Sequence, residues 1–147
     1  KDIDFPEETG IIIETPGFLP EETGYRNLKM LADIRRKADE EQIRKIMIKT
    51  GLDPDSKKQV KKYSLGMRER LGIAQTIMEN PRLLILDEPF NGLDKKGIVE
   101  VYLILKELKA QGVTILLASH NERDMEVLCD EIYEMEMGTL TKVRKEE

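Results

Sequence analysis

Two adjacent carboxylates, Asp87 and Glu88, stand directly after the apolar run 83–86 and directly before Pro89. An unbroken apolar run of this length predicts a strand covered on both faces in a parallel sheet, and the proline ends it. Open α/β sheets bind ligands in the crevice outside the carboxyl ends of their strands. An Asp-Glu pair placed there is suited to a divalent metal ion and to general-base chemistry, although an isolated pair also occurs in ordinary strand-end turns.

The only histidine, His120, follows a second apolar run, residues 113–118. The helical pattern between the two runs completes a strand–helix–strand unit, which predicts two parallel strands joined by a right-handed crossover. Because the carboxyl ends of parallel strands meet at one edge of a sheet, we expect His120 to lie beside Asp87 and Glu88. A lone histidine after a strand is more often structural, but its place in this crevice favours a functional role.

A third candidate is the start of a helix, at Ser64 and Gly66, which is predicted to end at Asn80-Pro81 because a proline disfavours helical geometry in the residue before it. A helix N-terminus carries unpaired N–H groups and the positive end of the helix dipole, so it attracts anions. Gly66 lets a ligand approach the backbone closely. Ser64 is also an ordinary N-cap residue.

Hydrophobic periodicity predicts the elements that position these residues. Two helices are expected over 24–37 and 39–50, ending at Gly51, with Leu28, Leu31, Ile34, Ile43, Ile46 and Met47 on their apolar faces. A short strand is expected at 9–13, a helix at 122–129, and a half-exposed strand at 132–137 that turns into 140–143.

Three of these segments resemble motifs of ABC-type ATPases. Residues 63–67, YSLGM, resemble the LSGGQ signature; residues 83–89, LLILDEP, resemble the Walker B strand; and residues 91–94, NGLD, resemble the D-loop. Each motif is weak alone, but their order and spacing follow the family. The similarity covers nearly the whole chain, with Glu14 in the place of the Q-loop glutamine. That replacement, together with the segment TPGF at residues 15–18, is typical of the branch that includes bacitracin and lantibiotic exporters.

This resemblance implies a Mg²⁺–ATP site at the strand ends. Asp87 is the expected Mg²⁺ partner through water, and Glu14 is a further metal and nucleotide contact, although a carboxylate cannot donate a hydrogen bond unless protonated. Glu88 is the expected general base, which orients water for attack on the γ-phosphate. His120 matches the switch histidine, which hydrogen-bonds that phosphate.

The resemblance also implies a head-to-tail dimer. Ser64 and Gly66 would face ATP held by a second ATPase subunit, in a homodimer or a heterodimer, and Asp94 of the D-loop belongs to the same nucleotide site. Leu65 replaces the first glycine of the signature and Met67 its glutamine, so these two residues depart from the family pattern.

Composition and one missing motif bound the interpretation. The net charge of −5 creates no field that would attract nucleic acid, the single Cys129 excludes an internal disulfide, and no run approaches the roughly 20 apolar residues of a membrane span. The chain opens without a secretory signal, so we expect a cytoplasmic protein. The phosphate loop G-x-x-x-x-G-K-[ST] is absent, so we interpret the sequence as the C-terminal portion of an ATPase domain.

The sequence therefore predicts an α/β fold: a P-loop NTPase (RecA-like) parallel sheet with an inserted helical subdomain, incomplete at the N-terminus. Residues 1–20 and 81–147 would belong to the core and residues 21–80 to the helical subdomain. The expected function is ATP hydrolysis coupled to transmembrane permease subunits at the inner face of the membrane, for export of a peptide antibiotic or drug. The alternatives are a soluble non-transport ABC ATPase and a fragment that cannot bind ATP without the phosphate loop.

Overall fold

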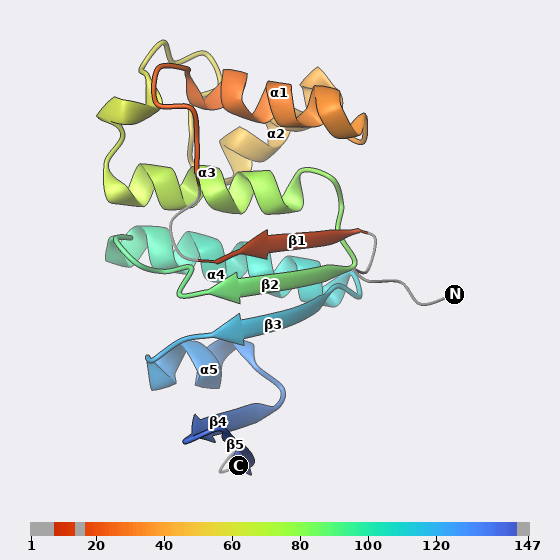
Figure 1. Ribbon diagram of the computed structural model, residues 1–147, viewed down its shortest axis with the longest axis vertical. Helices are drawn as coiled ribbons and strands as arrows, with labels where there is room; N and C mark the ends of the chain where they lie inside the picture. The colour runs from red at the N-terminus through yellow and green to blue at the C-terminus, as the bar shows by residue number, and fades with distance from the viewer. Residues whose placement is uncertain (1–7, 14–16, 144–147) are drawn as a thin grey trace.

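A computed structural model describes residues 8–13 and 17–143 of the chain. Figure 1 shows its elements in layers, with a group of helices above a parallel sheet and a hairpin below the sheet. In chain order they are β1 (Thr9–Ile12), α1 (Gly24–Arg35), α2 (Glu40–Lys49), the 3-10 turn η1 (Val60–Lys62), α3 (Leu65–Ile77), β2 (Leu83–Asp87), α4 (Lys95–Ala110), β3 (Thr114–Ala118), α5 (Glu122–Leu128), β4 (Ile132–Glu136) and β5 (Thr139–Val143).

The sheet has the strand order β1-β2-β3, and all its strands are parallel. The register pairs Leu86 with Leu117 and Asp87 with Ala118, so β2 and β3 end side by side. The arrowheads of the three strands point the same way in Figure 1. This confirms the parallel strand–helix–strand unit expected from the sequence.

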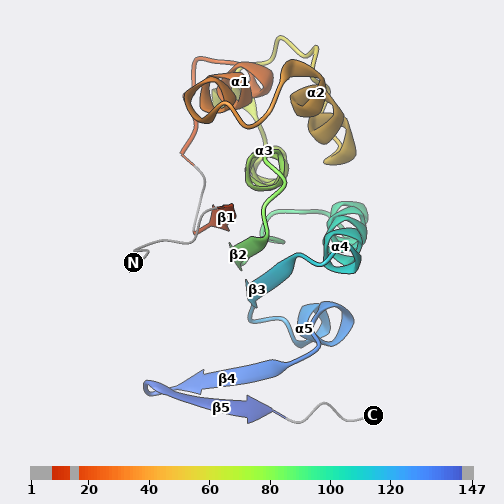
Figure 2. The same ribbon diagram turned by 90° about the vertical axis from the view of Figure 1, so that its right-hand side faces the viewer.

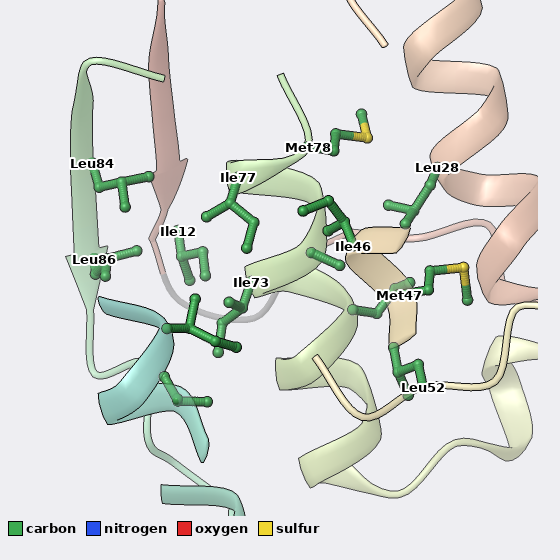
Figure 3. Packing of buried hydrophobic residues seen from close by; sticks show 14 of the residues in the cluster. Ile12, Leu28, Ile46, Met47, Leu52, Ile73, Ile77, Met78, Leu84 and Leu86 are labelled. Atoms are coloured by element: carbon green, nitrogen blue, oxygen red, sulfur yellow. The ribbon is translucent and has the colours of Figure 1, made fainter. Parts of the chain in front are cut away.

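One face of the sheet forms the core. Leu84 and Leu86 are at most 2% exposed and pack toward Ile73 and Ile77 of α3, as Figure 3 shows. The opposite face is less covered, since Leu116 on β3, in register with Ile85, is 62% exposed. The prediction that β2 is covered on both faces therefore holds for only one face, because the described helices pack closely against that side alone.

The helical layer lies above the sheet. Within it, α3 lies between the sheet and the pair formed by α1 and α2 (Figure 2). The expected end at Gly51 is confirmed: the N–H groups of Gly51 and Leu52 donate to the carbonyl oxygens of Ile48 and Met47, which closes α2 with a left-handed glycine. Ile34 was wrongly expected on the apolar face. It is 78% exposed because it lies six residues after Leu28, on the far side of the helix.

Two helices end earlier than their patterns predicted. The helix expected over 24–37 ends at Arg35, because Arg36 adopts a left-handed backbone with φ of 54°. The helix expected to continue to Asn80 ends at Ile77, and Asn80 itself has φ of 51°, a conformation that asparagine tolerates better than most residues.

The C-terminal part forms an antiparallel hairpin, β4 and β5, as expected, with Met135 opposite Leu140. Met137 and Gly138 both have positive φ and make its tight turn. Met135 is 72% exposed and Met137 is 99% exposed, so both methionine side chains of this hairpin lie in solvent. Across residues 8–13 and 17–143, no helix has the length and apolarity needed to cross a bilayer.

Candidate functional site

Glu88 begins the turn that follows β2. Its N–H donates to the carbonyl oxygen of Ala118 at 2.9 Å, which extends the pairing of β2 with β3 by one residue. Its backbone is left-handed, with φ of 49°. A residue other than glycine is strained in this conformation, and such strain is found preferentially at functional sites. The carboxylate leaves the strand here toward the loop after β3.

Glu88 and His120 meet at this edge of the sheet. The Glu88 Oε1 atom accepts from the backbone N–H of His120 at 2.9 Å and lies 2.8 Å from the His120 Nδ1 atom. The structure thus brings together two of the predicted site residues, 32 positions apart in the sequence. Both contacts use the same carboxylate oxygen, so the side chain of Glu88 is held from one side.

The contact also fixes the chemistry of the imidazole. The hydrogen bond and the charge of Glu88 raise the pKa of His120 above its usual value of 6.5. With Nδ1 donating to the carboxylate, Nε2 points away from Glu88 and can bind another group. The His120 side chain is 80% exposed and Glu88 is 31% exposed, so water and ligands can reach both.

Asp87 is the last residue of β2 and lies opposite Ala118. In the described part of the chain, no three histidine, cysteine or acidic side chains form a cluster able to hold a metal ion. Mg²⁺ does not require such a cluster, since it keeps several waters and is often bound by one or two carboxylates together with substrate phosphates. The half-buried carboxylate of Asp87 therefore fits that mode of Mg²⁺ binding, and it does not fit an all-protein metal cage.

Ser64 and Gly66 begin α3, as predicted. The Ser64 hydroxyl accepts from the Met67 N–H at 3.2 Å, so Ser64 is the N-cap. Gly66 lies against the D-loop, where an added Cβ atom would come within 2.8 Å of the carbonyl oxygen of Gly92. Leu65, which departs from the family glycine, also covers Gly92. The signature turn and the D-loop are thus packed together within one chain.

Asp94 begins α4. Its carboxylate accepts from the N–H of Gly97 at 2.8 Å and caps the helix. This capping bond accounts for an aspartate at the position without any ligand. Asp94 follows Gly92, which lies against Gly66, by two residues, and its contact with a nucleotide stays a prediction.

Two observations limit the site. Glu14 lies outside the described residues, so its predicted contact with metal and nucleotide stays a prediction. A cavity of about 130 Å³ is lined by residues at the amino end of the sheet, including Glu8, Thr9 and Pro81. It opens at the opposite end of the strands from Asp87 and Glu88, so it is not the predicted nucleotide site.

Sequence reasoning missed Asp124, which is 2% exposed although it lies on the short helix α5. It accepts hydrogen bonds from the hydroxyls of Ser119 and Tyr102. Tyr102 lies on α4, the helix between the two apolar runs. The one available signal was an acidic residue a single helical turn beyond His120, and exposed acids are too common there to single it out.

Comparison with known proteins identifies the family of the chain. The family model described as "ABC transporter" matches residues 2–91. The chain is 42% identical over 145 residues to the uncharacterized ABC transporter ATP-binding protein YybJ of Bacillus subtilis, covering 99% of this chain and 66% of that protein. It is 44% identical over 136 residues to the bacitracin transport ATP-binding protein BcrA of Enterococcus faecalis, covering 92% and 44%.

The lantibiotic transport ATP-binding protein SrtF of Streptococcus pyogenes is 42% identical over 121 residues, which are 82% of this chain and 52% of SrtF. The chain therefore spans between 44% and 66% of the length of these relatives. Among solved structures, the dimeric post-hydrolysis state of the ATP-binding cassette MJ0796, bound to ADP and Pi, superposes with a TM-score of 0.80 at 17% identity. The superposition covers 94% of this chain and 64% of that one and shows a shared fold. The chain belongs to the ABC transporter family, in the branch that contains bacitracin and lantibiotic transport ATP-binding proteins.

Proposed function

We propose that this chain is part of the ATP-hydrolysing subunit of an ABC exporter. The observation that carries the proposal is the contact of Glu88 with His120, one residue beyond Asp87, at the carboxyl ends of two adjacent parallel strands. A carboxylate that is positioned by hydrogen bonds and open to solvent suits a base that orients an attacking water. The family of the chain supports the choice of ATP as the substrate.

Each residue has a separate role in this proposal. Asp87 would hold Mg²⁺, and Glu14 would be a second contact for the metal and the nucleotide. Glu88 accepts a proton from the attacking water, while His120 presents Nε2 to the γ-phosphate and holds Glu88 through Nδ1. Bound Mg²⁺ would neutralise charge on the phosphates. The phosphate loop that binds the nucleotide in this family is absent from these 147 residues. The chain therefore supplies only the residues at the carboxyl ends of the strands.

Further contacts to the nucleotide, in addition to the phosphate loop, would come from a second subunit. Ser64 and Gly66 present an exposed helix N-terminus, where backbone N–H groups and the helix dipole favour a phosphate. Asp94 would join them from the D-loop. A dimer of ATPase subunits, identical or not, would then couple to transmembrane permease subunits at the inner face of the membrane. The names of BcrA and SrtF support a peptide antibiotic as the cargo.

The substitution Glu88→Gln in the full-length protein tests the central assignment. It removes the base while keeping size and a hydrogen-bond acceptor for His120, so we expect ATP binding to persist, turnover to fall at least about a hundredfold, and the dimer to accumulate with ATP. Asp130→Asn, on an exposed loop, is the matched carboxylate control and should leave turnover unchanged. Normal turnover by the Glu88→Gln protein would remove Glu88 as the base.

A titration of the 147-residue chain with ATP separates this proposal from the alternative of an inactive fragment. Micromolar binding by this chain would mean that the strand-end residues suffice for nucleotide affinity. Binding by the full-length protein alone would mean that the phosphate loop must be supplied by residues beyond this sequence, as the missing motif predicts.

A further inference from the structure

The loop that carries His120 is anchored on both sides to one buried residue, Asp124, through its carboxylate on one side and its backbone N–H on the other. Asp124 accepts at Oδ2 from the Ser119 hydroxyl at 2.8 Å, and its N–H donates to the carbonyl oxygen of Asn121 at 3.0 Å. The Ser119 oxygen in turn accepts from the Asn121 N–H at 3.1 Å. The residues immediately before and after His120 are therefore both fixed to Asp124, while His120 itself projects into solvent.

The same carboxylate reaches the helix that follows the D-loop. Tyr102 of α4 donates its hydroxyl hydrogen to Asp124 Oδ1. Burial and this hydrogen bond raise the pKa of Tyr102 to about 12, so the hydroxyl remains protonated, and remains a donor, across the physiological range. The two oxygens of Asp124 thus each accept from a hydroxyl, which is what an acid that is 2% exposed requires.

Tyr102 also contacts the segment of Glu88. Its ring meets the ring of Phe90 edge to face, with centroids 5.1 Å apart and an interplanar angle of 87°. Phe90 is 8% exposed and follows Glu88 by two residues. The ring of Tyr102 therefore supports the turn that carries Glu88, and its hydroxyl supports the turn that carries His120 through Asp124.

We infer that Tyr102 and Asp124 form a positioning pair that keeps His120 in contact with Glu88. Neither residue touches the proposed site of reaction; both act through the two turns that they join. The inference rests on the proposed function only where it concerns the effect of Tyr102 and Asp124 on ATP turnover. Its structural content, that the hydroxyl-to-carboxylate bond sets the distance between His120 Nδ1 and Glu88 Oε1, can be tested without any nucleotide.

The single histidine makes a direct test possible, because its Hε1 proton gives one imidazole signal by NMR in the full 147-residue chain after removal of any histidine tag. We expect the pKa of His120 to lie above 6.5 in the unmodified chain and to be lower in Glu88→Gln, because the charge that raises it is removed. Tyr102→Phe removes one oxygen atom and keeps the ring on Phe90. We expect it to lower the pKa of His120 in the same direction.

Asp124→Asn is the stronger variant, since an amide can accept from only one of the two hydroxyls at its single oxygen. Leu128→Ala is the matched control: it opens space on the same helix, α5, without touching the hydrogen bonds, and should leave the histidine titration unchanged while lowering stability. In the full-length protein, Tyr102→Phe should lower kcat for ATP about tenfold with little change in KM, because ground-state binding does not involve the pair.

These outcomes separate the inference from the proposed function. A folded Tyr102→Phe chain whose histidine titrates as in the unmodified chain would overturn the positioning role, whatever the ATPase activity. A lowered pKa in Tyr102→Phe and Asp124→Asn but not in Leu128→Ala would support it, even if the full-length protein did not hydrolyse ATP. The absence of ATP hydrolysis would count against the proposed function alone.

Discussion

Arg70 of the signature helix and Glu100 of α4 form an ion pair, with Nη1 and Oε2 2.7 Å apart. The same Nη1 donates to the carbonyl oxygen of Thr50, the residue that caps α2, at 2.8 Å. A Cβ atom added at Gly51 would come within 2.3 Å of Nη1, and one at Gly97 within 2.9 Å of Nη2. One guanidinium group, seated between two glycines, therefore connects the helical layer, the signature helix and the helix after the D-loop.

Replacing Arg70 with methionine should destabilise the chain by about 1.5–3 kcal/mol, because the carbonyl of Thr50 and the partly buried Glu100 both lose a charged donor. Chemical denaturation measured by circular dichroism would give the change in the free energy of unfolding. Lys96→Met is the matched control, since Lys96 lies 3.7 Å from the same Glu100 but is 83% exposed, and it should have a much smaller effect. If both variants lost the same free energy of unfolding, Arg70 would not stabilise the contact between these three elements.

Gly92→Ala should destabilise the chain more than Gly112→Ala, although both glycines have positive φ, of 73° and 89°. An alanine Cβ at 92 would lie 2.4 Å from the Cγ atom of Leu65, whereas one at 112 would meet no atom within 4 Å. We expect about 1 kcal/mol from backbone strain at 112, and roughly 1–3 kcal/mol more at 92 from overpacking.

The double variant Leu65→Gly/Gly92→Ala isolates the contact between the signature turn and the D-loop. Removing the leucine side chain should recover most of the extra loss in Gly92→Ala, as judged by thermal melting of the four proteins of the cycle. If the losses in stability of the two single variants simply added in the double variant, Leu65 would not clash with a side chain at position 92.

These contacts mark where the sequence stops being informative. Apolar runs and turn residues predicted the strands, because strands depend on patterns within short segments. The parallel pairing, and the approach of His120 to Glu88 across 32 residues, followed from the general topology of a strand–helix–strand unit. Other contacts join segments about 20 to 30 residues apart, which no local pattern encodes. Examples are the packing of Leu65 on Gly92 and the position of Arg70 between Gly51 and Gly97. The hydrogen bond of Asp124 with Tyr102, 22 residues away, was missed for the same reason.

Glu69 predicts an unusual dependence of stability on pH. It is 4% exposed on α3, and burial raises its pKa from 4.5 to about 7. The folded chain therefore binds this proton more tightly than the unfolded chain, so its contribution to stability is greatest below pH 4.5 and is lost as the pH rises through about 7.

Glu69→Gln should remove this dependence. We expect the variant to be more stable than the unmodified chain at pH 8, by about 1–3 kcal/mol, and similar to it at about pH 4, where Glu69 is largely neutral in both the folded and the unfolded chain. Urea denaturation at both pH values measures the difference. Glu134→Gln, on the exposed strand β4, serves as control and should give the same small change at both. A variant equally stable relative to the unmodified chain at both pH values would show that Glu69 is not kept neutral by burial.

The exposed N-terminus of α3 makes a prediction about assembly. Ser64→Arg places a long charged side chain where a phosphate of a neighbouring subunit is proposed to bind, so we expect it to block ATP-driven dimerisation of the full-length protein. Dimerisation is best measured by sedimentation with ATP in the Glu88→Gln background, in which hydrolysis does not dissociate the dimer. Because Ser64 is exposed, the fold should accept the arginine apart from the lost capping bond.

Ser64→Ala separates the cap from the proposed interface. It also loses the hydrogen bond from Met67, at a cost of about 1 kcal/mol, but it adds no bulk and keeps the backbone N–H groups of the helix N-terminus. We therefore expect Ser64→Ala to weaken the dimer only slightly while Ser64→Arg remains a monomer. If Ser64→Arg with ATP sediments as a dimer in this background, the start of α3 does not face the partner's nucleotide, and the proposal of a shared site fails while the role of Glu88 stands.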